Sequence, residues 1–348
     1  MKYDYDIVAI GLGPAGMAVS LMGSAMGLKV CGIERRKIGG ECLNIGCIPS
    51  KGLLKIAKLH SISKHFHDMG LAEGQKSELK QPFKKIREAV EFINENKTVG
   101  MFNKVDLILN EGNAEFVDPH TVSVGGRKVS AKKIFVCTGT SPMIPPIPGI
   151  DKVEFLTNEN MFDLDEPPKS MTIIGGGPIG CEMGQAFARL GTKVVIAHMD
   201  PHLLPVGDIE AGQLLQAELE KEGIEVYNGV KIEAISKSNG LIKVRIEGGK
   251  ELLSERLLVA AGRKVNLDGL KLENAGINYT KKGITVDKYL RTSNHDIFAA
   301  GDIANFENPH LGKRIRVEHE DNANTMGNVA GRNMAGEMNI YDHLPSFY

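Results

Sequence analysis

Apolar residues first gather at residues 5–10 (YDIVAI), in a short run that predicts a buried β-strand. The run ends in a glycine-rich turn, GLGPAG, and small residues over 17–26 follow in a pattern that predicts a helix. A second apolar run, KVCGIE, then ends at Glu34. This order predicts a strand, a glycine turn, a helix and a second strand.

The same order of elements recurs in the second half of the chain. Residues 171–174 (MTII) form an apolar run that ends in the turn GGGPIG, followed by a helical pattern over 181–190 and a strand-like run, KVVIAH. Both turns have the spacing G-x-G-x-x-G. In it one glycine makes the turn, one lets a pyrophosphate approach the backbone, and one lets the helix pack against the strand. Two such turns, each between a strand and a helix, predict two dinucleotide sites.

Helical and strand-like patterns alternate through the rest of the chain. The proline-rich stretch PMIPPIPG (142–149) predicts an ordered crossing between two domains. Apolar residues at helical spacing predict helices over 50–67 and 82–100, and a polar helix is expected over 318–335. Short strands are expected at 114–118, 121–126, 133–139, 224–229, 243–248 and 256–262.

Composition and charge exclude several classes of protein. Of the 348 residues, 42% are hydrophobic and 24% are charged, which is typical of a globular protein. The net charge of −1 provides no field that would attract nucleic acid or an anionic membrane. No apolar stretch is long enough to span a bilayer, and the first residues lack the features of a signal peptide. We therefore expect a cytoplasmic protein with no nucleic-acid or membrane partner.

The five cysteines are too few and too scattered for a secreted disulfide framework. Cys42 and Cys47 lie close together in GGECLNIGCIPSK, where spacing alone leaves open a redox couple, half of a metal site, or two ordinary small residues. A zinc site needs a second pair of Cys or His at suitable spacing, so we expect no metal. Cys31, Cys137 and Cys181 fall in predicted strands or at a helix start, and are expected to be buried packing residues.

Six motifs along nearly the whole chain resemble those of the FAD-dependent pyridine nucleotide–disulfide oxidoreductases, most closely the dihydrolipoamide dehydrogenase and glutathione reductase branch. They are IGLGPAG with Glu34, GGECLNIGCIPSK, CTGTSPMIPPIPG, IIGGGPIGCEMG, AAGRKVN and IFAAGDI. The resemblance implies an α/β fold of two Rossmann-like domains, with the NAD(P) domain inserted in the FAD domain. It places the first part of the FAD domain at 1–150, the NAD(P) domain at 151–280 and the returning FAD segment at 281–348.

The resemblance also implies two sets of cofactor-binding residues. Glu34 ends a strand where an acid suits the adenosine ribose of FAD, and Asp302 matches an aspartate that contacts the ribityl and phosphate region. Gly262 and Arg263 match a pair that closes the nicotinamide cofactor site. The FAD set is Gly11, Gly13, Gly16, Glu34, Gly40, Thr138, Gly139 and Asp302, and the NAD or NADP set is Gly175, Gly177, Gly180, His198, Gly262 and Arg263.

Four residues carry the catalytic roles that the resemblance implies. Cys42 exchanges with the substrate, and Cys47 lies against the flavin. Lys51 sits near the reactive nitrogen of the flavin and Glu182 pairs with that lysine. The expected reaction passes hydride from NAD(P)H to FAD, then electrons to Cys42 and Cys47, then to a small-molecule or protein disulfide, or runs in reverse. Two alternatives stay open: an NAD(P)H oxidoreductase for a quinone, electron carrier or persulfide, and a redox-regulated flavoprotein that acts by binding partners.

Several features depart from the family pattern. His198 stands where a site for NAD usually carries an acid, and with the nearby His202 it favours NADPH or use of both cofactors. The segment 316–348 is more similar to flavoproteins like the apoptosis-inducing factor, which leaves the electron acceptor open. His319 in this segment is expected to cap or pack a helix, or to lie near the flavin.

The family's C-terminal dimerisation domain has no counterpart before Tyr348. In the family this domain builds the dimer and supplies a histidine–glutamate pair as acid and base for the thiols. We therefore expect a truncated chain that binds FAD but is impaired in disulfide turnover, and a homodimer for a full-length form.

Overall fold

The computed structural model describes residues 2–71 and 78–346, and the chain folds into two compact units. The first unit comprises residues 1–44, 91–141 and 264–348, and the second comprises 45–90 and 142–263. The chain therefore leaves the first unit twice and returns to it twice. Residues 45–90, which carry Cys47 and Lys51, pack with the second unit.

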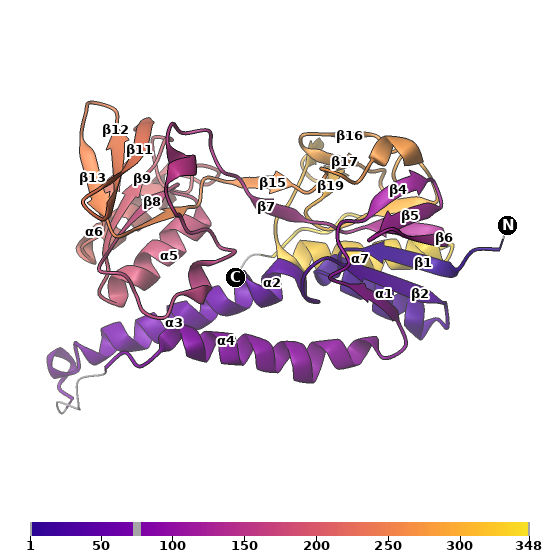
Figure 1. Ribbon diagram of the computed structural model, residues 1–348, viewed down its shortest axis with the longest axis horizontal. Coiled ribbons are helices and arrows are strands. Elements are labelled where there is room, and N and C mark those ends of the chain that lie inside the picture. Colours follow the sequence, from indigo (N-terminus) through magenta and orange to yellow (C-terminus); the bar gives the residue numbers. More distant parts are fainter. Residues whose placement is uncertain (1, 72–77, 347–348) are drawn as a thin grey trace. The chain divides into compact units, whose positions relative to one another are not determined.

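The first unit is built on a seven-stranded sheet with the order β3-β2-β1-β6-β5-β4, with β18 also pairing to β6 (Figure 1). Neighbours are parallel from β3 through β1 to β6 and on to β18, whereas β4 and β5 run antiparallel. The strands are β1 (Tyr5–Ile10), β2 (Val30–Glu34), β3 (Asp106–Leu109), β4 (Glu115–Asp118), β5 (Thr121–Val124), β6 (Arg127–Val136) and β18 (Ile297–Ala299).

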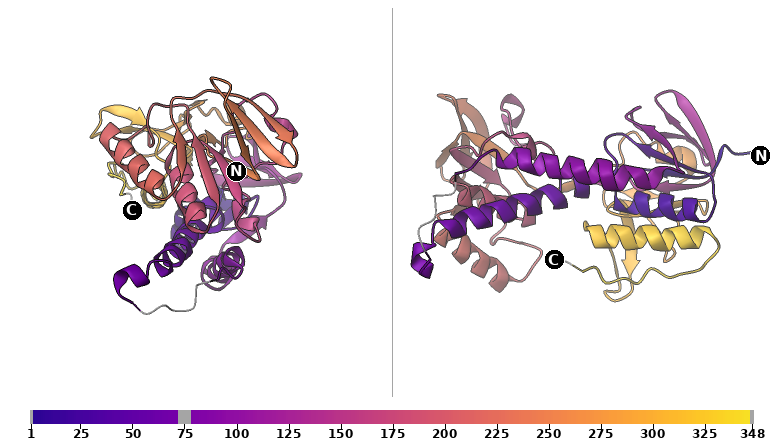
Figure 2. Two further views of the ribbon diagram at one scale, coloured as in Figure 1. Left: turned by 90° about the vertical axis from the view of Figure 1, so that its left-hand side faces the viewer. Right: turned by 90° about the horizontal axis from the view of Figure 1, so that it is seen from below.

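Helices α1 (Pro14–Ala25) and α7 (Glu320–Met334) lie side by side in the first unit (Figure 2). Small residues allow this approach, because a Cβ added at Gly327 would lie 2.4 Å from the carbonyl oxygen of Ala15. The remaining elements are α2 (Gly40–Asn44) and a small sheet of β16 (Tyr279–Thr280), β17 (Gly283–Thr285), β19 (Ala304–Asn308) and β20 (Lys313–Ile315).

The second unit has its own parallel sheet, with the order β10-β9-β8-β14. The unit also contains a separate three-stranded antiparallel sheet, β11-β12-β13. These strands are β8 (Ser170–Ile174), β9 (Lys193–Ala197), β10 (Glu225–Tyr227), β11 (Ile232–Ser238), β12 (Leu241–Ile246), β13 (Glu251–Ser254) and β14 (Arg256–Val259), and the helices that follow β8 and β9 are α5 (Pro178–Arg189) and α6 (Ile209–Lys221). The predicted α/β fold with two Rossmann-like units is confirmed.

Helix α3 (Cys47–Ser63) and the first part of α4 (Pro82–Ile93) complete the core of the second unit. Leu53 and Ala57 of α3 are fully buried in one apolar cluster with Phe83 of α4 and Phe187 of α5. The two phenylalanine rings lie 5.9 Å apart. This packing holds the helix that begins with Cys47 against the helix that follows the second glycine turn.

Two predicted helices have different ends in the structure. The helix expected over 50–67 starts earlier, at Cys47, and ends at Ser63. The helix expected over 82–100 is α4 only to Ile93, after which one π-helical turn (Asn94–Thr98) and a short 3₁₀ turn (Val99–Phe102) follow. In that turn the hydroxyl of Thr98 donates to the carbonyl of Ile93 and so competes with the regular helical bonds. The crossing segments include β7 (Thr140–Pro142) and β15 (Arg263–Val265), which pair with each other.

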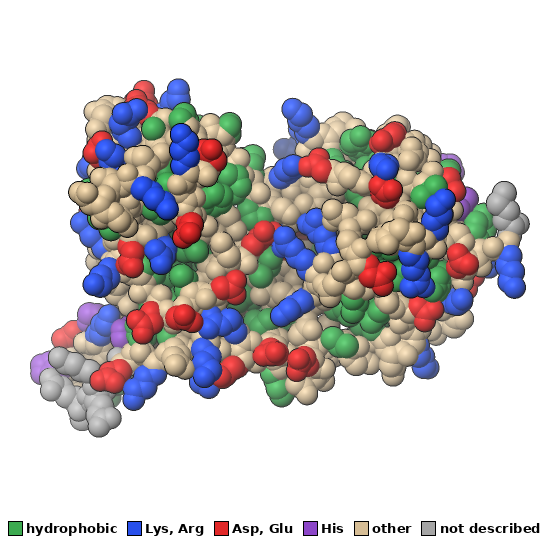
Figure 3. Space-filling model, in the orientation of Figure 1, with side chains coloured by type: hydrophobic (Ala, Val, Ile, Leu, Met, Phe, Trp, Pro, Cys, Tyr) green, Lys and Arg blue, Asp and Glu red, His purple; other side chains and the backbone are tan. Residues whose placement is uncertain are grey.

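Acidic and basic side chains are interspersed on the face of each unit that Figure 3 shows. This mixture agrees with the net charge of −1. Among the described residues no helix has the length and apolar character needed to cross a bilayer.

Candidate functional site

The first glycine turn, between β1 and α1, has no room for side chains at its first and last glycines. Gly11 has φ +92°, and a Cβ there would lie 2.4 Å from the carbonyl oxygen of Cys137. A Cβ at Gly16 would lie 1.8 Å from the carbonyl oxygen of Gly11. Both positions therefore require glycine for the fold itself: at Gly11 the φ is one that L-residues disfavour, and at both positions the backbone fills the space that a Cβ would need.

The middle glycine of this turn lies beside a second glycine backbone. Gly13 caps α1 and has no side chain to offer to the first N–H groups of the helix, which lack partners within a helix. A Cβ at Gly40 would lie 2.7 Å from the Cα of Gly13. Two glycine backbones thus flank a helix N-terminus, where N–H groups and the helix dipole favour a phosphate.

Glu34 at the end of β2 binds the glycine turn directly. Its Oε2 accepts a hydrogen bond of 2.8 Å from the backbone N–H of Leu12, and its Oε1 accepts one of 2.8 Å from that of Arg36. Glu34 is 9% exposed, so the carboxylate is anchored at the mouth of the turn. Each carboxylate oxygen retains a further lone pair for a ribose hydroxyl.

The other predicted FAD residues of the first unit follow β6 and β18. The hydroxyl of Thr140 donates to Asp302 Oδ2 at 2.9 Å, and a Cβ at Gly301 would lie 3.3 Å from that of Ala15, at the start of α1. Strands β1, β6 and β18 are parallel and adjacent, so Gly11, Thr138, Gly139 and Asp302 follow carboxyl ends at one edge of the sheet.

Asn266 is a residue of this region that the sequence did not single out, although it ends the motif AAGRKVN. Its side-chain amide donates to the carbonyl of Thr138 at 2.8 Å, and its Oδ1 accepts from the hydroxyl of Ser141 at 2.7 Å. Its backbone N–H donates to Gly139, and its carbonyl accepts from the hydroxyl of Thr138. Asn266 therefore clamps the segment that holds Thr138 and Gly139.

The second glycine turn, between β8 and α5, repeats the geometry of the first. Gly175 has φ +115°, with its Cβ position 2.2 Å from the carbonyl oxygen of Ala260. The Cβ position of Gly180 lies 2.0 Å from the carbonyl oxygen of Gly175. Gly177 caps α5, and a Cβ there meets no described atom within 4 Å. The chain thus builds a second helix N-terminus that fits a pyrophosphate.

His198 at the end of β9 is bonded to this turn and is 6% exposed. Its Nδ1 accepts a hydrogen bond of 2.9 Å from the backbone N–H of Gly176, so the proton of the neutral ring lies on Nε2. Nε2 is buried without a hydrogen bond to any described group and faces Asp200 Oδ2 at 3.5 Å. Burial lowers the pKa of His198, although Asp200 opposes this effect.

The last two predicted nucleotide residues follow β14. Gly262 has φ +114°, and its carbonyl accepts from the backbone N–H of Met143 at 2.9 Å. A Cβ there would lie 3.2 Å from Cε of Met143. Arg263 begins β15 and is half-buried. In the second unit, β8, β9 and β14 end near one edge of the parallel sheet, where Gly175, His198 and Gly262 follow them.

Cys42 lies half-buried in the short helix α2 of the first unit. The start of this helix is held by two asparagines that the sequence did not single out. Asn44 donates to the carbonyls of Ile38 at 3.0 Å and Gly40 at 2.9 Å. Asn94, at the start of the π-helical turn, donates to the carbonyl of Ile38 at 2.7 Å. The π-helical turn therefore supports the segment that leads into α2, the helix of Cys42.

Cys47 is the first residue of α3 in the second unit and is exposed. Lys51 lies one turn further along the same helix, and its ammonium binds both carboxylate oxygens of Glu182 on α5, at 2.8 and 2.9 Å. The side chains of Lys51 and Glu182 are 54% and 38% exposed, which leaves the pair accessible. The expected pairing of Lys51 with Glu182 is therefore present in the structure.

The three other cysteines are buried, as the sequence predicted. Burial raises the pKa of each of the Cys31, Cys137 and Cys181 thiols to about 12. They remain protonated at neutral pH, and a protonated thiol is a poor nucleophile. Of the five cysteines, Cys42 and Cys47 are the two whose side chains are not buried.

His319 and His202, the two other histidines considered in the sequence, each contact a backbone group close by in the chain. His319 caps α7, where its Nδ1 accepts from the backbone N–H of Asp321 at 3.3 Å, as the capping alternative expected. His202 lies with its Nδ1 2.8 Å from the carbonyl oxygen of Leu203. Within the described residues no three His, Cys, Asp or Glu side chains gather as metal ligands do.

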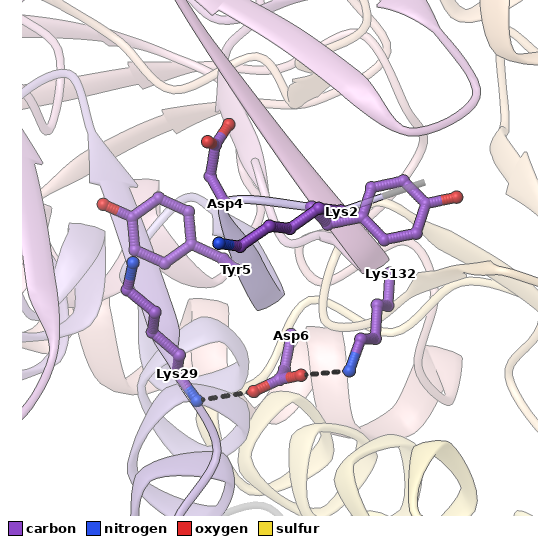
Figure 4. Close-up of a pocket in the computed structure, with 7 residues that line it drawn as sticks. Lys2, Asp4, Tyr5, Asp6, Lys29 and Lys132 are labelled. Atoms are coloured by element: carbon purple, nitrogen blue, oxygen red, sulfur yellow. Dashed lines mark hydrogen bonds and ion pairs between the residues drawn. The ribbon is translucent and has the colours of Figure 1, made fainter.

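A surface hollow of about 400 Å³ lies at the amino end of β1, the opposite end of the strand from Gly11 (Figure 4). The carboxylate of Asp6 is bound there by the ammonium of Lys132 at 2.7 Å and the backbone N–H of Lys29 at 2.9 Å. The ammonium of Lys29 also lies 4.6 Å above the ring of Tyr5. The charged groups of this hollow are therefore bound to one another. The glycine turns, with their helix N-termini, fit a pyrophosphate better.

Comparison of the sequence with known families gives a match over residues 5–327 to the pyridine nucleotide-disulphide oxidoreductases. A mercuric reductase from Bacillus cereus is 34% identical over 307 residues, which cover 87% of this chain and 49% of that protein. A dihydrolipoyl dehydrogenase from Thermus scotoductus is 34% identical over 358 residues, which cover 98% of this chain and 73% of that protein. The chain thus spans about half the length of the mercuric reductases that it matches.

Comparison of the fold with solved structures finds the flavoprotein disulfide reductase RclA from Escherichia coli, which is induced by HOCl. The TM-score is 0.83 at 29% identity, and the match covers 96% of this chain and 72% of that one. The same fold therefore extends over both compact units.

Proposed function

Because the chain belongs to the pyridine nucleotide-disulphide oxidoreductase family, we propose that it is an FAD- and NAD(P)H-dependent disulfide oxidoreductase. Members of the family use FAD and NAD(P)H. We assign FAD to the first unit, through Gly11, Gly13, Gly16, Glu34, Gly40, Thr138, Gly139 and Asp302. We assign the nicotinamide cofactor to the second unit, through Gly175, Gly177, Gly180, His198, Gly262 and Arg263.

The observation that carries the proposal is the ion pair of Lys51 with Glu182. It ties the helix that begins with Cys47 to the helix that begins at the second glycine turn. A helix N-terminus stabilises a thiolate, and Lys51 places a cation one turn along the same helix. The pair thereby couples the position of the thiol to the nucleotide-binding turn.

FAD, held in the first unit, would supply hydride exchange with the nicotinamide cofactor and two-electron exchange with Cys42 and Cys47. The reduced Cys42 thiolate attacks one sulfur of the substrate disulfide, which forms a mixed disulfide and releases one thiol. The Cys47 thiolate then attacks the sulfur of Cys42 and releases the second thiol. The substrate gains two electrons and two protons, and Cys42 and Cys47 are left joined as a disulfide.

Two properties extend from the family to this chain within the same proposal. Disulfide substrates and dimeric assembly are typical of the family, and we infer both for this protein. Lipoamide, glutathione disulfide and a quinone, each tested as electron acceptor with the FAD-loaded protein, separate a disulfide reductase from an NAD(P)H:acceptor oxidoreductase.

Anaerobic two-electron reduction of the FAD-loaded protein tests the roles of the cysteines. We expect a long-wavelength absorption band from charge transfer between the Cys47 thiolate and the flavin, and its loss in Cys47→Ser. Cys31→Ala is the matched control, since Cys31 is fully buried and its thiol stays protonated. A reduced protein without the band contradicts the proposal and leaves the quinone or binding-module alternatives.

A further inference from the structure

We propose that Asp200, positioned by His198, accepts the adenosine ribose hydroxyls of the nicotinamide cofactor, and that the chain therefore takes NADH in preference to NADPH. The inference rests on the proposed function, since it concerns how the second glycine turn selects its dinucleotide. It reverses the preference for NADPH or dual use that the two histidines suggested.

The first part of the argument is the state of His198. Its Nδ1 is occupied by the N–H of Gly176, and the ring is 6% exposed. A ring in this position is neutral and keeps its single proton on Nε2, so it provides no cation for a phosphate. His198 therefore acts as an anchor between β9 and the glycine turn.

The second part is the direction of the remaining proton. Nε2 is buried without a hydrogen bond to a described group, and Asp200 Oδ2 lies 3.5 Å from it. An N–H that faces a carboxylate at this distance attracts it electrostatically and shortens into a hydrogen bond with a small shift of the carboxylate. The Asp200 side chain is 50% exposed, so its outer oxygen is accessible to a ligand.

The third part is the backbone that holds this segment. The carbonyl of Asp200 accepts from the N–H of Gly229 at 2.9 Å, and the carbonyl of His198 accepts from the N–H of Val230 at 3.0 Å. The N–H of Leu204 donates to the carbonyl of Gly176 at 2.8 Å. Asp200 is thus fixed next to the turn on which the pyrophosphate rests.

The fourth part is the charge of the segment after β9. Residues 199–208, MDPHLLPVGD, contain two acids, Asp200 and Asp208, and no Lys or Arg. A carboxylate at this edge of the sheet binds the ribose 2′-hydroxyl, whereas a 2′-phosphate requires cations. The nearby His202 has its Nδ1 within hydrogen-bonding distance of the carbonyl of Leu203. The segment therefore suits a ribose with free hydroxyls.

Binding of the adenosine half alone tests the inference without turnover. ADP-ribose and 2′-phospho-ADP-ribose are titrated calorimetrically into the FAD-loaded protein. We expect ADP-ribose to bind at least about tenfold more tightly in the wild-type protein. Asp200→Asn should weaken ADP-ribose by about tenfold, because hydrogen bonds to charged groups are the stronger ones. It should not weaken 2′-phospho-ADP-ribose, because it removes a negative charge beside the 2′-phosphate.

Glu247→Gln is the matched control, because it removes one exposed negative charge from the turn after β12 in the same unit. It should leave the ratio of the two affinities unchanged. Nitrogen-15 NMR of His198, assigned by the signals missing in His198→Gln, should show a neutral ring protonated at Nε2 at neutral pH. This readout does not depend on any ligand.

The outcomes separate the two proposals. Tighter binding of the 2′-phosphate form, or an unchanged ratio in Asp200→Asn, overturns the role of Asp200 and leaves the oxidoreductase function standing. A cationic His198 at neutral pH overturns the anchor. Binding of neither ligand contradicts the proposed function itself, and the inference falls with it.

Discussion

The two glycine turns solve the same structural problem with different side chains. In the first unit the residue after the turn's first glycine, Leu12, donates its N–H to Glu34. In the second unit the equivalent Gly176 donates to His198. The Glu34 carboxylate accepts from the turn and still has lone pairs for a ribose hydroxyl. The neutral imidazole of His198 has a single acceptor nitrogen, and the N–H of Gly176 already occupies it. The second unit must therefore recognise the ribose with another group, and Asp200 is placed to do so.

The largest expected effect concerns what the two turns share. Gly16→Ala and Gly180→Ala each place a Cβ about 2 Å from a backbone oxygen, so each should lower the free energy of unfolding by about 3 kcal/mol or more. Urea unfolding of the two variants measures this. A mild effect in either variant would show that its turn has more room than the structure describes.

The next largest effect is a difference in stability between variants of the two anchoring residues, Glu34 and His198. Glu34→Gln keeps one acceptor where two backbone N–H groups need one each, and should cost about 2 kcal/mol of stability. His198→Gln keeps an acceptor for the single N–H of Gly176 and should cost about 1 kcal/mol. Urea unfolding measures both losses. A larger loss in the free energy of unfolding for His198→Gln than for Glu34→Gln would contradict these roles.

The dependence of stability on pH isolates the second anchor. Burial lowers the pKa of His198 below its ordinary value of 6.5, so the unfolded chain binds a proton that the folded chain resists. Stability due to this residue is complete above the unfolded pKa and is lost as the pH falls below it, by up to about 1.4 kcal/mol for each pH unit. Urea unfolding midpoints are measured for the wild type and His198→Gln from about pH 7.5 to about pH 5.5. The gap between the two curves should narrow as the pH falls, because the contribution of His198 to stability is lost. Parallel curves would contradict a buried neutral His198.

The smallest expected effect concerns the exposed ion pair. Lys51→Ala should lower stability by less than about 1 kcal/mol, because solvent screens a pair that is 54% and 38% exposed. Lys55→Ala, one turn further on the same exposed face, is the matched control. A loss as large as that for Glu34→Gln would mean that the pair holds the second unit together rather than serving the thiol.

Much of this arrangement could be predicted from the sequence. Glycine spacing and strand patterns are local signals, and they located both turns, Glu34 and the fold class. Apolar spacing also predicted helices near α3 and α4, but not the π-helical turn after Ile93, since that turn depends on side-chain bonds of Asn94 and Thr98.

The rest of the site depends on contacts between residues far apart in the chain. Asn266 clamps a segment more than a hundred residues before it, and although it ends the motif AAGRKVN, the motif does not show which residues it contacts. His198 appeared as a possible cation because composition does not reveal which ring nitrogen is occupied. Only its bond to Gly176 and its burial show that it is an anchor.

The most direct test of the central claim, that the two turns hold different dinucleotides, compares Gly13→Ala with Gly177→Ala. Each adds one methyl group at a helix cap, where the nearest described atom is 3.8 Å away for Gly13 and beyond 4 Å for Gly177, so both variants should fold. FAD content and ADP-ribose affinity are measured on both. We predict that Gly13→Ala loses FAD and keeps ADP-ribose, and that Gly177→Ala keeps FAD and loses ADP-ribose. Loss of the same ligand in both variants, or the reverse pattern, would contradict the account.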